Sequence, residues 1–252
     1  MQSPPIPQAE IDARIKGHLD ELLELWWAEQ GVSKPRDLEL IALALPFPRG
    51  DAIRALDLCC GPGDVGRAIR SVYPKARIDC IDRDPFLTSI CRAINQRERI
   101  PGALVVKDLA EETWRDVLTD EYDVVATVNA LHWFDARRAG QLVEEIHETL
   151  RDGGLFVFAE PACPETPFQT GFEEWKAKQP ARYSRENWER FWSRANALLG
   201  YDHPALWGPR QTSRIDDELS VSGWIRLVER AGFRLVDVLL RDADQVVIAA
   251  RK

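Results

Sequence analysis

Short apolar runs alternate with helical patterns along much of the chain, and this alternation most constrains the fold. The apolar runs lie at residues 53–58, 77–81, 103–106, 122–128 and 155–159. Helical patterns separate them, at residues 65–72, 86–95, 112–118 and 137–150. Strands that alternate with helices form right-handed βαβ units around a buried parallel sheet. The alternation therefore predicts an α/β fold.

The C-terminal pattern differs from the rest. A helix is expected at residues 221–231, followed by strands at 234–240 and 245–250. About four residues separate the two strands, too few for a parallel crossover, so they must pair as an antiparallel hairpin. The predicted fold class is a Rossmann-like, doubly wound sheet of seven strands that is mostly parallel and ends in an antiparallel hairpin.

Three regions are expected. Residues 1–50 form an N-terminal helical segment, with one amphipathic helix at about 11–29 and a short helix at 38–45. Residues 51–160 and 220–252 form the core. Residues 161–219 carry several tryptophans and arginines but no clear strand pattern, so we interpret them as an inserted helical cap.

Composition argues against several functional classes. The formal net charge of −8 opposes the basic surface of a nucleic-acid-binding protein. We find no apolar run of the roughly 20 residues that cross a bilayer, and no signal-peptide pattern, so a cytoplasmic protein without a membrane partner is expected. The five cysteines form no C-x-x-C pair, so we expect reduced thiols and no metal site.

The stretch from Ala55 to Gly66 contains a glycine-rich loop directly after the first predicted strand. Its G-x-G-x-x-G spacing is weak by itself, because a strand-to-helix turn needs glycines for steric reasons. Three acids, Asp57, Asp82 and Asp108, lie at or near the ends of three different strands. Parallel strand ends share one edge, where such folds bind ligands. The joint placement of these acids is therefore the stronger signal.

The segment Leu56-Asp-Leu-Cys-Cys-Gly-Pro-Gly63 resembles the first motif of class I S-adenosylmethionine-dependent methyltransferases, an acidic residue followed by a Gly-x-Gly turn. The likeness continues through the core to the C-terminal hairpin. It implies S-adenosylmethionine as the cofactor, with the amino-acid end near Asp57 and the loop residues Cys59, Gly61 and Gly63 close to it. Asp57 capping the next helix is the alternative. The family often has glycine where this chain has Cys59, so that residue must keep a negative φ or accept strain.

The resemblance assigns further cofactor contacts. It implies that Asp82 accepts the ribose hydroxyls, a role that would also suit a nicotinamide dinucleotide. It places Arg83 against the adenine, whose amino group Asp108 would receive while the backbone of Leu109 meets the ring. A helix cap is the alternative for Asp108. Asn129 is the last residue assigned to the cofactor, whereas Asp84 is better explained as a helix cap before Pro85.

The segment Val128-Asn-Ala-Leu-His-Trp-Phe-Asp135 follows the fourth predicted strand. Its His-Trp-Phe-Asp sequence resembles the corresponding segment of a small-molecule subgroup related to trans-aconitate methyltransferases. His132 is a candidate general base for a hydroxyl acceptor, whereas a carboxylate acceptor needs none. Packing beside the cofactor is the alternative for His132.

The acceptor is expected under the cap. We assign its binding to Trp133, Trp175, Arg182 and Trp192, because aromatic rings can form an apolar pocket and a guanidinium can clamp an anion. Tryptophans that form the cap's own core, and solvated arginines, are the alternative. Trp26 and Trp27 either close the cofactor site or pack on the sheet or on a second subunit.

The preferred function is methylation of a small-molecule acceptor by S-adenosylmethionine, at a carboxylate or hydroxyl oxygen, by a monomer or homodimer. An NAD-dependent oxidoreductase is the first alternative, which Asp57 and the terminal hairpin oppose. The second alternative is a non-catalytic cofactor-binding protein of the same fold, since fold alone does not establish turnover.

Overall fold

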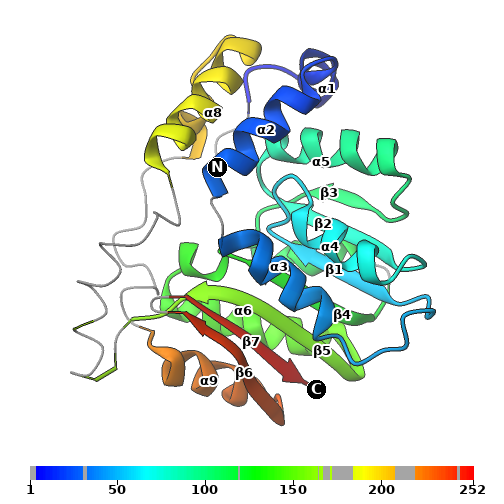
Figure 1. Cartoon of the computed structure of the whole chain (residues 1–252), viewed down its shortest axis with the longest axis vertical. Helices are drawn as coiled ribbons and strands as arrows, with labels where there is room; N and C mark the ends of the chain where they lie inside the picture. The colour runs from blue at the N-terminus through cyan, green and yellow to red at the C-terminus, as the bar shows by residue number, and fades with distance from the viewer. Residues whose placement is uncertain are drawn as a thin grey trace.

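A seven-stranded sheet forms the centre of the molecule in the computed structural model (Figure 1), which describes residues 4–30, 33–118, 120–163, 165–166, 171, 184–207, 219–242 and 245–252. The strand order is β3-β2-β1-β4-β5-β7-β6. The strands are β1 Arg54–Leu58, β2 Arg77–Asp82, β3 Leu104–Val106, β4 Tyr122–Val128, β5 Leu150–Pro161, β6 Leu235–Asp242 and β7 Gln245–Arg251. The first five pair in parallel, whereas β7 is antiparallel to both β5 and β6. The predicted fold class is confirmed.

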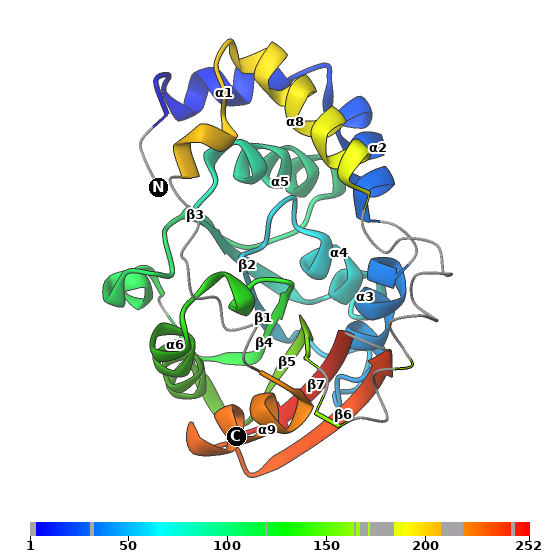
Figure 2. The ribbon, with the colours of Figure 1, turned by 90° about the vertical axis from the view of Figure 1, so that its left-hand side faces the viewer.

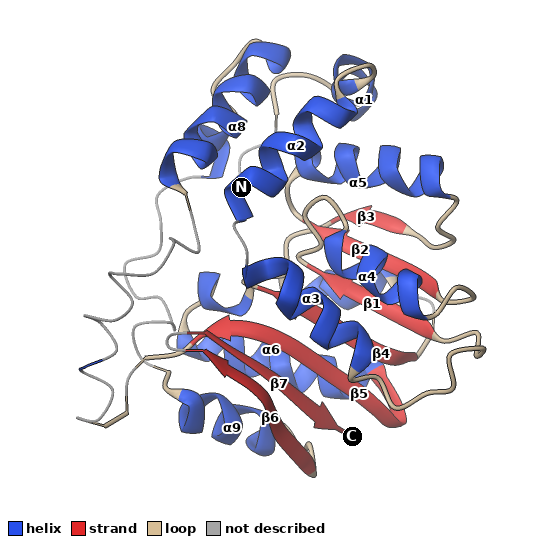
Figure 3. Cartoon of the chain, viewed as in Figure 1, coloured by secondary structure: helices blue, strands red, loops and turns tan. Residues whose placement is uncertain are grey.

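Helices cover both faces of this sheet (Figure 3). Helices α3 Ser33–Leu43, α4 Asp64–Val72 and α5 Pro85–Glu98 lie on one face, and α6 Ala136–Thr149 and α9 Val221–Arg230 lie on the other. Strand alternation explains the two layers, because successive side chains point to opposite faces. Leu56 and Leu58 join the core under α6 and α9, whereas Ala55 joins the core under α3 and α4. Asp57 shares its face with Ala55.

A third core lies beyond the edge of the sheet. Helices α1 Gln8–Ile15, α2 Leu19–Gln30 and α8 Arg185–Leu199 pack together over α5 (Figure 2), and the short 3₁₀ helix η4 Pro204–Trp207 follows α8. We call these four helices with the α5 side chains beneath them the aromatic lobe. Trp26 lies 5.2 Å from Phe191 between ring centroids, and Phe86 lies 6.0 Å from Trp192. The N-terminal segment and the described part of the predicted cap thus share one core.

Three predicted boundaries were wrong, and one predicted helix is of another type. The single helix expected at 11–29 is two helices, because Gly17 between them has φ +92°, a left-handed conformation that ends a helix. Helix α3 begins at Ser33 rather than at residue 38, and η1 Glu112–Val117 is a 3₁₀ helix. Strand β5 begins at Leu150, which pairs with Tyr122, although that residue was expected to end a helix.

No helix in the described part of the chain is both long and apolar enough to span a membrane.

Candidate active site

The carboxyl ends of β1 to β4 meet at one edge of the sheet, and the predicted cofactor residues gather there. The strand order reverses between β1 and β4, and such a reversal is where doubly wound sheets bind ligands. The Cys59 thiol, in the loop after β1, is affected by the charges of four residues at or near the ends of other strands. These residues are Asp82, Arg83, Asp108 and Glu160. The structure therefore places these residues around the loop that follows β1.

The glycine loop is built from left-handed backbone. Cys59, Gly61 and Gly63 have φ values of +52°, +52° and +88°. For cysteine this conformation costs about 1–2 kcal/mol, so the chain accepts strain where glycine would have none. Burial, and then the charge of Asp82, raise the pKa of the Cys59 thiol well above its ordinary value. The Cys59 thiol therefore lacks the low-pKa surroundings of an activated nucleophile, and its contact with the cofactor stays a prediction.

Asp57 is buried with one carboxylate oxygen in use. Its Oδ2 accepts a hydrogen bond from the Gly66 backbone N–H at 2.9 Å, so it does cap the first turn of α4. Its Oδ1 is buried and has no hydrogen-bond partner among the described residues. Burial raises the pKa of Asp57 well above its usual range, although the Gly66 N–H lowers it. A cationic ligand at Oδ1 would satisfy the atom that the fold leaves unpaired.

Asp82 ties the glycine loop to the end of β2. Its Oδ2 accepts from the Gly61 N–H at 2.8 Å, and its Oδ1 accepts from the Asp84 N–H at 2.8 Å. Burial, and then the charge of Asp84, raise the pKa of Asp82 to about 6. Each carboxylate oxygen has a second lone pair, so Asp82 retains capacity for two hydroxyl donors.

Arg83 and Asp108 lie across from each other at the ends of β2 and β3. An Arg83 guanidinium nitrogen is 3.7 Å from Asp108 Oδ2, and Asp108 Oδ1 accepts from the Ala110 N–H at 2.9 Å. The Leu109 side chain is buried, and its carbonyl accepts from Arg138 Nε at 2.8 Å. Asp108 therefore makes a local turn bond and is not the helix cap of the alternative interpretation, because the N-cap of η1 is Glu111. Its adenine role stays a prediction.

Trp26 covers the glycine loop from α2. Its indole N–H donates to Asp64 Oδ2 at 2.8 Å, and Lys34 lies 3.1 Å from the same oxygen. A ring carbon of Trp26 is 3.7 Å from the position of a Cβ placed on Gly61. Trp26 thus packs against the glycine loop and against Phe191, and its closure of the cofactor site stays a prediction.

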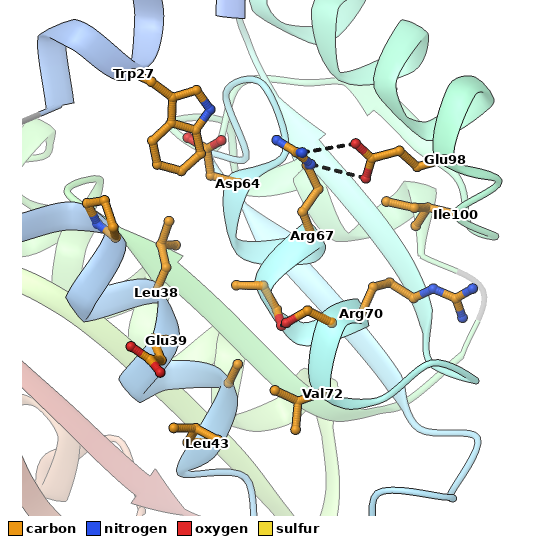
Figure 4. A pocket seen from close by; sticks show the side chains of 14 residues that line it. Trp27, Leu38, Glu39, Leu43, Asp64, Arg67, Arg70, Val72, Glu98 and Ile100 are labelled. Atoms are coloured by element: carbon orange, nitrogen blue, oxygen red, sulfur yellow. Dashed lines mark hydrogen bonds and ion pairs between the residues drawn. The ribbon is translucent and has the colours of Figure 1, made fainter. Parts of the chain in front are cut away.

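Trp27 points elsewhere, into a groove of about 630 Å³ between α3 and α4 (Figure 4). Arg67 and Glu98 form an ion pair of 2.9 Å at its edge. None of the three acids predicted to hold the cofactor is among the described residues that line this groove. The groove is therefore distinct from the carboxyl-edge site, although Asp64 contributes to its wall.

His132 is held by a carboxylate that sequence reasoning missed. Glu160 is fully buried near the end of β5, and its Oε1 accepts from the Ala130 and Leu131 N–H groups at 2.8 and 2.7 Å. Its Oε2 lies 2.7 Å from His132 Nδ1. The signal was present in the sequence, because an acid that closes an apolar strand needs a buried partner.

Asn129, between β4 and this histidine, has φ +54°. Its backbone N–H donates to the Ala159 carbonyl at 2.8 Å, and its Oδ1 accepts from Gln245 Nε2 at 3.1 Å. The loop after β4 is thus fastened to both β5 and β7. Its cofactor contact stays a prediction.

The predicted acceptor residues separate into three groups. Trp133 is 36% exposed, and its ring centroid lies 5.5 Å from that of His132. Trp192 is buried in the aromatic lobe and stacks on His203 at 5.7 Å, which agrees with the alternative that such tryptophans form the cap's own core. Trp175 and Arg182 lie outside the described residues.

Asp84 joins the aromatic lobe to the sheet edge. It caps α5, as predicted, because its Oδ1 accepts from the Phe86 and Leu87 N–H groups. The fully buried His203 Nε2 lies 2.9 Å from the same oxygen, and the Trp207 indole donates to Oδ2 at 2.9 Å. Burial would raise the pKa of Asp84, but the hydrogen bond and charge of His203 lower it below its usual value.

Comparison with known proteins also indicates a methyltransferase. Residues 55–154 match a family described as "Methyltransferase domain". The malonyl-[acyl-carrier protein] O-methyltransferase of Bacillus anthracis is 24% identical over 151 residues, covering 59% of this chain and 52% of that protein. The trans-aconitate 2-methyltransferase of Paracidovorax citrulli is 27% identical over 136 residues, covering 54% and 49%. The chain spans about half the length of these curated relatives.

Solved structures show the same fold. A putative O-methyltransferase from Nostoc punctiforme superposes with a TM-score of 0.55 at 17% identity, covering 85% of this chain and 55% of that one. Human N-acetylserotonin methyltransferase in complex with SAM gives a TM-score of 0.54 at 16% identity, covering 86% and 51%. At these identities the likeness concerns the fold.

Proposed function

The chain carries a methyltransferase domain of the class I, S-adenosylmethionine-dependent family, and from this premise we propose that it transfers the cofactor's methyl group to a hydroxyl oxygen of a small-molecule acceptor. The observation that carries the proposal is the buried His132–Glu160 pair beside the glycine loop. A carboxylate acceptor, which is already ionised at neutral pH, would not need it.

The residues at the carboxyl edge fit this cofactor. Asp57 Oδ1 is a buried acceptor with no hydrogen-bond partner in the described part of the chain, and the cofactor's amino-acid end carries an ammonium group. Pairing the two, directly or through water, would offset the cost of burying the carboxylate. The left-handed loop residues Gly61 and Gly63 allow close approach of the backbone.

The adenosine end would lie along β2 and β3. We assign the ribose hydroxyls to Asp82, whose two oxygens each retain a lone pair after binding backbone N–H groups. We assign the adenine to the space between Arg83 and Leu109, with Asp108 accepting its amino group. A nicotinamide dinucleotide could use Asp82 but would leave Asp57 Oδ1 without a cation.

The chemistry at the acceptor divides between cofactor and protein. When bound, S-adenosylmethionine supplies an electrophilic methyl group on a positively charged sulfur. His132 would take the acceptor hydroxyl proton at Nε2, because its Nδ1–H donates to Glu160 and sets the tautomer. Glu160 is itself held by two backbone N–H groups, so it orients the ring and stabilises the imidazolium. Trp133 would line the acceptor pocket next to the base.

Calorimetric titration tests the cofactor. S-adenosylmethionine and S-adenosylhomocysteine should bind the wild-type protein. The Asp57→Asn variant should bind both compounds more weakly, because both carry the amino-acid end that Asp57 would hold. Arg67→Gln, on the α3–α4 groove, is the control and should bind as wild type does. Binding of NAD alone would overturn the assignment.

Matched acceptors test the base. With hydroxyl or phenol acceptors, His132→Gln should lower kcat by about 10²–10⁴-fold. Glu160→Gln keeps an acceptor for the Ala130 and Leu131 N–H groups but removes the charge behind the imidazole, so it should also slow these acceptors. Neither variant should slow a carboxylate acceptor, and His147→Gln, in α6, should leave both reactions unchanged. An equal loss with both acceptor classes would make His132 a positioning residue.

A further inference from the structure

Three cysteines converge in the interior although nothing in their spacing suggests it. Cys60 lies in the glycine loop, Cys80 in β2 and Cys91 in α5, and their relative exposures are 6%, 1% and 0%. Their three sulfur atoms all lie within 4.8 Å of one another. The sheet register explains the meeting, because Asp57 pairs with Cys80 on the neighbouring parallel strand and the chain reaches Cys60 shortly afterwards.

The sulfur triangle has nearly the size of a metal site. Even if every edge were 4.8 Å, the centre would lie about 2.8 Å from each sulfur, compared with a zinc–sulfur distance of about 2.3 Å. A shift of about half an ångström per sulfur would therefore close three bonds.

One side chain already contacts the cluster as a hydrogen-bond donor. The Asn95 side-chain amide donates to Cys91 Sγ at 3.6 Å. This sulfur therefore serves as an acceptor in the folded protein, which is also the role that it would take toward a cation.

We propose that Cys60, Cys80 and Cys91 form a binding site for one thiophilic metal ion, Cu(I), held by three thiolates. Soft thiolate ligands select Cu(I) and zinc, but zinc would need a water as its fourth ligand, and the three thiols that the described residues supply are buried. Binding involves no redox step, because the ion joins three sulfurs while the remaining thiol protons pass to solvent. The site is independent of the methyl acceptor.

The cluster also touches the glycine loop. A Cβ placed on Gly63 would lie 2.8 Å from Cys91 Sγ, so the thiol fills the space that this glycine leaves. Because metal binding is measured on the cofactor-free protein, its failure would say nothing about methyl transfer.

The test is anaerobic titration of the reduced, cofactor-free protein with Cu(I) held by a competing chelator. One ion per chain should bind, with an ultraviolet thiolate-to-copper band. Cys60→Ser, Cys80→Ser and Cys91→Ser should each weaken binding by more than about 100-fold, since losing even an outer-shell partner costs 10–100-fold. Cys163→Ser, outside the cluster, is the control and should bind as wild type does. Wild-type affinity in all three cluster variants would overturn the site.

X-ray absorption of the wild-type copper complex covers the case in which a serine variant fails to fold. Three sulfur neighbours at one short distance support the proposal. Two sulfur neighbours, or a four-coordinate zinc complex with no Cu(I) binding, contradict it. Formation of a Cys60–Cys80 disulfide in place of metal uptake also contradicts it.

Discussion

Two buried aspartates, Asp57 in β1 and Asp84 at the N-cap of α5, have opposite electrostatic surroundings. Asp57 has one backbone donor and a buried oxygen without a hydrogen-bond partner among the described residues, and its pKa is raised. Asp84 has two backbone donors, an imidazole and an indole, and its pKa is lowered. Burial is nearly equal, at 1% and 3% exposure.

The difference lies in the donors. Where the fold supplies enough of them, as at Asp84, a buried carboxylate becomes a structural joint between the aromatic lobe and α5. Where the fold supplies too few donors, as at Asp57, burying the carboxylate costs free energy until a bound ligand supplies the missing partner. In this pair, the carboxylate with all its donors holds two parts of the fold together, and the carboxylate with an unpaired oxygen is the one that we assign to the ligand.

Asp84→Ala should give the largest effect. It leaves a buried imidazole, an indole and two helix N–H groups without their acceptor, so the free energy of unfolding should fall by about 3–5 kcal/mol. Urea denaturation followed by circular dichroism measures the loss. Asp84→Asn, which keeps one acceptor oxygen, should cost less. A loss below about 1 kcal/mol for the alanine variant would remove the distinction between the two aspartates.

Asp57→Asn should have the opposite character. It removes an incompletely paired buried charge, so the free energy of unfolding should stay equal or rise, while cofactor affinity falls by about 1–3 kcal/mol. Denaturation and calorimetry on the same sample separate the two quantities. A variant that is destabilised as strongly as Asp84→Ala would show that Asp57 is also a structural joint.

Acidification should weaken cofactor binding through Asp82, whose pKa is about 6. Affinity should fall up to about tenfold per pH unit below 6 if the ionised carboxylate is required. The effect on folding has the opposite sign. A carboxyl with a raised pKa takes up its proton first in the folded state, so Asp82 raises the free energy of unfolding as pH falls from about 6 to 4. Asp84, with a lowered pKa, loses its contribution only as pH falls below its unfolded value.

Calorimetry between pH 7 and pH 5 measures the binding effect. Asp82→Asn should bind more weakly at pH 7 and show a flatter profile. A wild-type profile that stays level through pH 6 would exclude Asp82 as a charged acceptor.

The smallest expected effect distinguishes two indoles of the aromatic lobe. The Trp207 N–H donates to Asp84, whereas the buried Trp192 N–H has no hydrogen-bond partner among the described residues. Both substitutions remove the same side-chain volume. The lost hydrogen bond should therefore make Trp207→Phe lower the free energy of unfolding by about 1–2 kcal/mol more than Trp192→Phe does. Equal losses would mean that the indole hydrogen bond contributes nothing to the joint.

Local patterns in the sequence were enough to predict the sheet. Strand alternation, the short link between the last two strands and the Asp84-Pro85 helix start are all read within about ten residues, and the structure confirms each. The N-terminal helix break was also local, since Gly17 interrupts the periodic pattern, but a single glycine is often tolerated within a helix.

The remaining features depend on pairs of residues that only folding brings together. Glu160 meets His132 across 28 residues, and His203 meets Asp84 across 119. The cysteine cluster joins a loop, a strand and a helix. Neither residue of such a pair carries a signal that specifies its partner, so the sequence predicts His132 as a candidate without showing what orients it.

The joining of α2 to α8 has a consequence for how the protein is made. The Asn187 side chain donates to the Ala28 carbonyl across 159 residues, so α2 emerges from the ribosome long before the helix that covers it. At about 5–20 residues per second, the apolar side of α2 waits roughly 8–30 s for α8. During that interval it is an accessible apolar surface, and the aromatic lobe cannot form until α8 has emerged, although β7, which completes the sheet beside β5, follows later still.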